Sequence, residues 1–152
     1  MKGKADAEAL RFGGVNPIFR VENLAASIDY YVRVLGFKID WEFTDVIACV
    51  SRDNVAIFLS QGDQGHPGAW AWIGVGDVER VHDELLQKGA SIRQPPTNFP
   101  WALEMQVTDL DGNVLRLGSD PKKNRAIGEW LDMYGNRWKR NREGGWTLIE
   151  GR

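Results

Sequence analysis

Histidine and cysteine, the usual ligands of transition metals, are sparse in this sequence of 152 residues. Its two histidines are His66, in a loop rich in glycine and proline, and His82, on a predicted helix. The single cysteine, Cys49, lies in the apolar stretch DVIACV, where we expect a small buried hydrophobic residue. One cysteine excludes an internal disulfide and any metal site built from several cysteines. A site of the usual kind would therefore lack ligands, and we expect no metal ion and no cofactor.

A positive charge, Arg116, interrupts the apolar strand that ends the stretch DLDGNVLRLGS. A guanidinium in such a strand is costly unless it is paired or faces a cavity. Glu104 or Asp109 could neutralise it, whereas a ligand with a carboxylate would find in it a bidentate partner. If DLDGN forms a simple hairpin, Arg116 lies opposite Met105, and Glu104 and Gln106 lie on the other face of the sheet. A bulge would reverse that assignment.

Tryptophan is unusually frequent, with seven residues in the chain. Trp70 and Trp72 share one face of a strand by two-residue alternation, and Trp101 follows Pro100 at the entrance to another strand. A core seldom holds so many indoles, because each buried N–H needs an acceptor. Each of these side chains could belong to the core, but as a set they favour a cleft that stacks on a flat, cationic or heteroaromatic ligand.

The elements that must position these residues form a repeat of about 54 residues. Residues 16–43 and 69–96 both read as a strand, a capped amphipathic helix, a glycine stop and a strand. The predicted caps and stops are Asn23, Gly36, Asp77 and Gly89. The predicted apolar stripes comprise Leu24, Ile28, Tyr31 and Leu35 in the first helix and Val78, Val81, Leu85 and Leu86 in the second.

Three strands are predicted after each helix, so the chain comprises two βαβββ units. We predict an α+β fold in which the two modules form a curved mixed sheet around a cleft. Half a barrel of this kind cannot bury both faces of its sheet, so halves from one chain or from two must combine. The predicted divisions are an N-terminal arm at 1–13, a first module at 14–62, a second module at 63–120 and a basic C-terminal extension at 121–152.

Residues 15–119 resemble the vicinal oxygen chelate superfamily, which includes glyoxalases, bleomycin-resistance proteins and extradiol dioxygenases. The stretches that carry the resemblance are LGF after the first helix, RDNVAIFLSQGDQGHPGAWAWIGV, PWALEMQV and DLDGN. Together, in this order, they are most similar to the bleomycin-resistance branch.

The resemblance also indicates where metal-dependent members of the superfamily place their ligands. A histidine early in each module and a carboxylate in the last strand would correspond to Asn16, Trp70 and Arg116. Asparagine is a poor ligand for a transition metal, tryptophan is none, and arginine does not lose its proton to bind one. We therefore expect no metal-polarised chemistry and no catalytic residues.

The resemblance further places Phe37, Trp41 and Phe58 around the same cavity as the tryptophans of the second module. The expected ligand-binding residues are therefore Asn16, Phe37, Trp41, Phe58, Trp70, Trp72, Trp101 and Arg116. In the similar resistance proteins, protection comes from sequestering a drug in grooves between the two subunits of a dimer. We expect a homodimer that binds a small aromatic molecule or a glycopeptide-type antibiotic. Pro17 matches a proline at which that branch exchanges its N-terminal strand between subunits, although a proline is also simply tolerated at an edge.

Two enzymatic alternatives remain open at this stage. One is a glyoxalase-like lyase or isomerase whose divalent metal is held by His66, Glu104 and Asp109. The other is an enzyme without a metal in which Glu104 acts as general base beside Arg116.

Charge is distributed unevenly along the chain. Residues 1–120 hold 11 Lys and Arg against 17 Asp and Glu, giving −6, and residues 121–152 hold 8 against 4, giving +4. The acidic body argues against a nucleic-acid partner, and the basic tail is expected to be solvated. No apolar run approaches a membrane span and the start has no signal core, so we expect a cytoplasmic protein without a membrane partner. Residues 126–135 are predicted to form a short helix that ends at Gly135.

Overall fold

The structure is a computed structural model that describes residues 2–151. The first module comprises β1 (Ile18–Val21), α2 (Leu24–Arg33), β2 (Lys38–Phe43), β3 (Ile47–Arg52) and β4 (Val55–Gln61). The second comprises β5 (Trp70–Gly74), α3 (Val78–Gln87), β6 (Ser91–Asn98), β7 (Leu103–Thr108) and β8 (Val114–Ser119).

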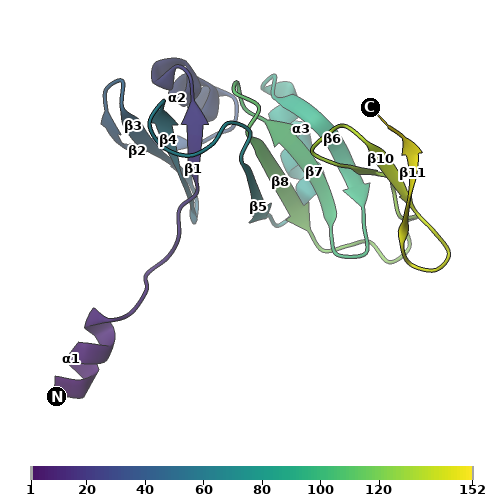
Figure 1. The fold of residues 1–152 in the computed structure, drawn as a ribbon, viewed down its shortest axis with the longest axis horizontal. Helices are drawn as coiled ribbons and strands as arrows, with labels where there is room; N and C mark the ends of the chain where they lie inside the picture. Colours follow the sequence, from purple (N-terminus) through teal and green to yellow (C-terminus); the bar gives the residue numbers. More distant parts are fainter. Residues whose placement is uncertain (1, 152) are drawn as a thin grey trace.

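Each module folds into a four-stranded mixed sheet, and the two sheets lie side by side (Figure 1). The strand orders are β1-β4-β3-β2 and β5-β8-β7-β6. The pairs β1–β4 and β5–β8 are parallel and the remaining pairs are antiparallel. The identical strand order confirms the prediction of two βαβββ modules in an α+β fold.

Both module helices begin where the sequence predicts. They end shortly before the predicted glycines, α3 at Gln87 and α2 at Arg33, so Leu35 lies beyond α2. The side chains of Asn23 and Asp77 each accept a hydrogen bond from a backbone N–H of the first helical turn, which satisfies a group that the helix leaves unpaired. Gly36 and Gly89 have φ values of 78° and 84°, and this left-handed conformation suits glycine because it has no Cβ.

One hydrophobic core runs through both modules. Apolar residues of α2 and α3 pack in it against the inner faces of their sheets. The predicted helix stripes are buried at Leu24, Ile28, Tyr31, Leu35, Val78 and Leu85. Val81 is half-buried, and Leu86 is exposed because it lies on the outer side of α3.

The turn between β7 and β8 joins the second module to the first. The Tyr31 hydroxyl donates to Asp109 Oδ2 at 2.9 Å, and Asn113 Nδ2 donates to the Arg20 carbonyl at 3.0 Å. Asn113 also accepts from the Ala69 N–H at 3.0 Å. Desolvation raises the pKa of Asp109 even though the hydrogen bonds that it accepts oppose the rise. The carboxyl is therefore a buried structural group between the modules.

At the N-terminus, α1 (Lys2–Ala9) stands away from the body of the molecule at the end of an extended segment (Figure 1). Leu10, Phe12 and Val15 in and beside this segment are strongly exposed. No helix among residues 2–151 is long and apolar enough to cross a membrane.

The C-terminal extension contains strands, and the prediction of a helix at residues 126–135 is wrong. It forms a three-stranded antiparallel sheet of β9 (Trp130–Leu131), β10 (Arg137–Arg140) and β11 (Trp146–Glu150), in the order β11-β10-β9. Asp132 accepts backbone hydrogen bonds from Tyr134 and Asn136, and Gly135 has a φ of 87°. These side-chain-to-backbone bonds favour a tight turn over a helix at this place.

Candidate functional site

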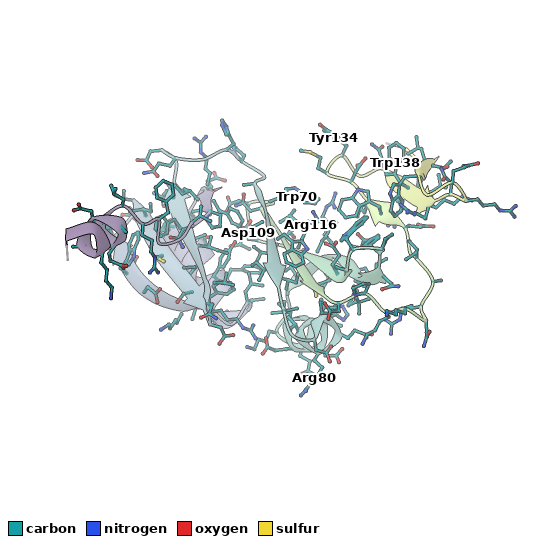
Figure 2. The ribbon with its side chains drawn as sticks, turned by 90° about the horizontal axis from the view of Figure 1, so that it is seen from below. Trp70, Arg80, Asp109, Arg116, Tyr134 and Trp138 are labelled. Atoms are coloured by element: carbon teal, nitrogen blue, oxygen red, sulfur yellow. The ribbon has the colours of Figure 1, made fainter. Side chains whose placement is uncertain are left out.

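The aromatic and charged residues singled out in the second module lie on one face of its sheet. Trp72 pairs with Arg116 across β5 and β8, and Arg116 pairs with Gln106 across β8 and β7. Residues that face one another across strands point to the same side, and Trp70 is two residues from Trp72. Figure 2 shows Trp70 and Arg116 near one another, toward the C-terminal strands, whereas α3, which carries Arg80, lies on the opposite side of the sheet. This face is called the tryptophan face below.

Arg116 is neutralised by Glu104. Its Nε and Nη2 atoms lie 2.9 and 3.0 Å from the two carboxylate oxygens, a bidentate pair. The Glu104 side chain is 1% exposed and that of Arg116 is 26% exposed. The Trp101 indole N–H also donates to Glu104, and the Arg116 guanidinium lies 5.0 Å from the Trp130 ring centroid. Arg116 therefore contributes no free charge to this face.

Of the two face assignments considered for DLDGN, the simple hairpin does not form, and the reversed assignment holds. Met105 pairs with Leu117, and Arg116 pairs with Gln106, so Glu104 and Gln106 share the face of Arg116. The reason is the length of the turn: Thr108 pairs with Val114, which leaves five residues between the paired ends. The odd-numbered loop shifts every later residue by one position and exchanges the two faces.

The C-terminal extension covers much of the tryptophan face with polar contacts. Arg93 lies 5.2 Å from the Trp70 ring centroid and donates to Gln106 and to the backbone carbonyl of Asp132. Gln106 Nε2 also donates to the Leu131 carbonyl at 3.3 Å. Burial lowers the pKa of Arg93, although the nearby charge of Asp132 opposes the shift.

An aromatic cluster joins the extension to the second module. Phe99 and Trp101 stack with centroids 5.0 Å apart and planes 6° from parallel. Trp130 meets both rings edge-on at 5.6 and 6.0 Å, and Trp146 is tilted against both at 6.3 and 5.9 Å. Phe99 and Trp130 were not among the residues expected at the site. The turn sequence DMYGN, which matches DLDGN in its Asp, Gly and Asn, could have indicated that a hairpin carries Trp130.

Beside this covered region, Trp72 and Trp101 line an open pocket of about 540 Å³. They are 52% and 47% exposed, which is unusual for two large aromatic side chains at a pocket. The Trp72 ring lies directly over Gly118, where a Cβ would stand 2.8 Å from Cζ2. Glycine therefore lets the indole lie flat on the strand. Asp77, Asp120 and Lys122 complete the polar part of the lining.

The residues singled out in the first module lie apart from this pocket. Trp41 and Phe58 pack edge-to-face at 5.1 Å on the first sheet, and among residues 2–151 no ring contact joins them to Trp70, Trp72 or Trp101. Asn16 is exposed before β1, and its Nδ2 donates to the Ala56 carbonyl at 3.1 Å. Phe37 is buried in the core, edge-on to Tyr31 at 5.5 Å.

The residues considered for metal binding or acid–base chemistry are dispersed or engaged. His66 is exposed in the loop before β5, whereas Asp109 is buried at the junction of the modules. Both oxygens of Glu104 accept hydrogen bonds from Arg116, and Oε1 also accepts from the Trp101 indole N–H. Within residues 2–151, no three His, Cys, Asp or Glu side chains are grouped so that they could hold a metal ion.

Comparisons with known proteins agree with this architecture. Residues 14–117 match the family described as Glyoxalase/Bleomycin resistance protein/Dioxygenase superfamily. No curated protein matches the chain.

Three solved structures of similar fold illustrate the likeness. TnmS3, an antibiotic binding protein from Streptomyces sp. CB03234, is 20% identical with a TM-score of 0.64, over 74% of this chain and 99% of that one. The bleomycin-binding protein from bleomycin-producing Streptomyces verticillus, complexed with copper(II)-bleomycin, is 23% identical with a TM-score of 0.62, over 74% and 99%. TioX from Micromonospora sp. ML1 is 21% identical with a TM-score of 0.62, over 70% and 98%. Two βαβββ modules with the same strand order, together with the family match over most of the chain, show that this chain belongs to the glyoxalase/bleomycin resistance protein/dioxygenase superfamily.

Proposed function

We propose that this protein sequesters a small planar aromatic molecule, without altering it chemically, by stacking it between Trp72 and Trp101. The observation that carries the proposal is the Trp72 indole, which lies flat over Gly118 and remains half exposed at a pocket. Exposed aromatic rings that flank a pocket present stacking surfaces to a ligand.

The charges around the pocket favour a neutral or cationic ligand. Because Glu104 neutralises Arg116, the free charges of the lining are Asp120 and Lys122, together with Asp77, which caps α3. A cation over an indole face gains roughly 0.5–2 kcal/mol. The solved structures that bind an antibiotic or bleomycin share this fold, so a glycopeptide-type antibiotic of the bleomycin kind is a reasonable first ligand to test.

A second copy of the chain is proposed as the partner. The Phe12 side chain is 97% exposed, and Leu10 and Val15 beside it are also uncovered. On the first module, Trp41 and Phe43 form a second uncovered aromatic surface. A homodimer in which the segment before Pro17 is exchanged would cover such apolar side chains, which isolated monomers rarely leave in contact with water.

The binding proposal is tested by titrating the protein with metal-free bleomycin and with proflavine, a planar cation, while tryptophan fluorescence is followed. We expect saturable quenching, and we expect Trp72→Ala to weaken binding by roughly 2- to 30-fold, which is the loss of one stacking contact. Trp138→Ala is the matched control, because Trp138 lies on β10 and its indole N–H is held by Asp132. No binding of either compound, or equal weakening by both variants, would contradict the proposal.

A further inference from the structure

A second pocket lies on the other side of the second-module sheet, between the two modules. Its volume is about 300 Å³, and its walls include Leu35, Phe37, Val55, Ile73, Leu85 and Leu117. Leu117 alternates with Arg116 and Gly118 along β8, so the walls of this pocket and the tryptophan face are on opposite sides of the strand. The two pockets share Gly74, Val75 and Gly76 at the end of β5. It is called the intermodule pocket below.

The repeat in the chain explains why this space is open. Counting from the two helix starts, Tyr31 of α2 corresponds to Leu85 of α3. Tyr31 crosses to the second module, is fully buried and bonds to Asp109 in the β7–β8 turn. Leu85 points to the matching place in the first module, near the β3–β4 turn, but it has no ring to fill the space.

The β3–β4 turn is also shorter than the corresponding β7–β8 turn. The β7–β8 turn has five residues between its paired ends and carries Asp109, whose carboxylate receives the Tyr31 hydroxyl. The β3–β4 turn has only two, because Arg52 pairs directly with Val55. At the junction of α3 with the first module, the smaller side chain of Leu85 and the shorter β3–β4 turn leave a space. At the junction of α2 with the second module, Tyr31 and the longer β7–β8 turn fill the corresponding space.

The rim of the intermodule pocket offers polar atoms but no free cation. The Arg52 Nη atoms lie 2.8 and 3.2 Å from the carboxylate oxygens of Glu84, and Nη1 also donates to the Leu35 carbonyl at 2.9 Å. An anionic ligand would therefore lose its hydration without gaining a partner. The carboxylate of Asp53, which also lines the pocket, is exposed at the rim, so the apolar walls themselves offer a cation no partner. An apolar cavity of about 150 Å³ is known to hold benzene, so a space of this size suits a bicyclic molecule.

We propose that the intermodule pocket is a second binding site, separate from the pocket at Trp72, and that it takes an uncharged, mainly apolar molecule of about the size of indole. The walls are largely core residues, so the molecule would complete the packing between the modules and stabilise their junction.

Indole itself is the probe for the test. The protein is labelled with ¹³C at the methyl groups of Ile, Leu and Val and titrated with indole. We expect the largest shifts at Ile73, Val55 and Leu117. We also expect Leu85→Phe, which places a ring in the space, to weaken indole binding at least tenfold. Leu86→Phe is the matched control, since Leu86 follows on the same helix but is exposed and does not line the pocket.

Further variants separate this site from the first one. Trp72→Ala should leave the shifts at Ile73 and Leu117 unchanged. If Leu85→Phe does not fold, Val81→Phe replaces it, because Val81 lines the pocket but is half-buried. The proposal is overturned if indole does not bind, if the filled variant binds it as well as the wild type does, or if only Trp72→Ala abolishes the shifts.

Discussion

Replacing Arg116 by leucine should destabilise the protein strongly, because it leaves a buried carboxylate without its partner. The Glu104 side chain is 1% exposed, and both of its oxygens accept from the guanidinium. Removing one member of a buried ion pair costs about 3–5 kcal/mol, since the remaining charge keeps its desolvation cost and loses the compensating interaction. The Trp101 N–H is the one other hydrogen-bond donor to Glu104 within the described chain, and it is neutral.

The two partners should not be equivalent. Arg116 is 26% exposed and lies over Trp130, so after Glu104→Leu the guanidinium keeps a cation–π contact and some water. We therefore expect Glu104→Leu to cost less than Arg116→Leu, and the double leucine variant to be more stable than Arg116→Leu alone. Arg137→Leu is the surface control, because its pair with Glu129 spans 3.8 Å at side chains 43% and 50% exposed. Such exposed pairs contribute about 0–1 kcal/mol.

Urea unfolding at pH 7, followed by far-ultraviolet circular dichroism, measures these differences as free energies. A cost below about 1 kcal/mol for Arg116→Leu, equal to that of Arg137→Leu, would refute the reasoning.

Three further variants test other parts of the structure. Gly118→Ala places a Cβ 2.8 Å from the Trp72 ring and should displace the indole, weakening proflavine binding roughly 2- to 30-fold. Gly3→Ala is the control and should leave binding unchanged, because Gly3 lies in α1, outside the pocket, and no atom lies within 4 Å of the added Cβ. Although desolvation opposes it, hydrogen bonds from Trp138, Asn136 and Tyr134 lower the pKa of Asp132 to about 2 from 3.8. The stabilisation from ionised Asp132 is therefore present above about pH 4 and is lost as the pH falls through 2. This loss should appear as an acid transition in near-ultraviolet circular dichroism of the wild type, and the Asp132→Ala variant should lack it. Tyr31→Phe leaves Asp109 without one buried donor and should cost about 1–3 kcal/mol in urea unfolding, whereas an unchanged midpoint would show that the junction bond contributes nothing.

The module architecture could be predicted because its signals are local. Asn23 and Asp77 cap helices whose apolar stripes recur at helical spacing, and these patterns do not depend on distant contacts. The position of Arg116 relative to Glu104 depends instead on the number of residues in one turn. Because the side-chain period of a strand is two, an error of one residue in that turn moves Glu104 to the other face.

The C-terminal extension could not be placed from its sequence in the same way. Its apolar pattern around Trp130 fits a helix, but the local turn at Asp132 favours strands instead. Contacts of Trp130 with Phe99, Trp101 and Arg116, which the sequence does not reveal, fix where the hairpin lies. The surroundings of Phe37 also differ from those that the family resemblance suggested. The family resemblance placed it around the cavity of the tryptophans, but in the structure it is a core residue that borders the intermodule pocket.

Fluorine NMR of protein labelled with 5-fluorotryptophan tests the central proposal most directly, because each of the seven tryptophans gives its own signal. The signals are assigned with single Trp→Phe variants and followed during titration with metal-free bleomycin and with proflavine. We expect the signals of Trp72 and Trp101 to shift most and the Trp138 signal to stay unchanged. Shifts confined to Trp41, or an unchanged Trp72 signal at saturation, would contradict it.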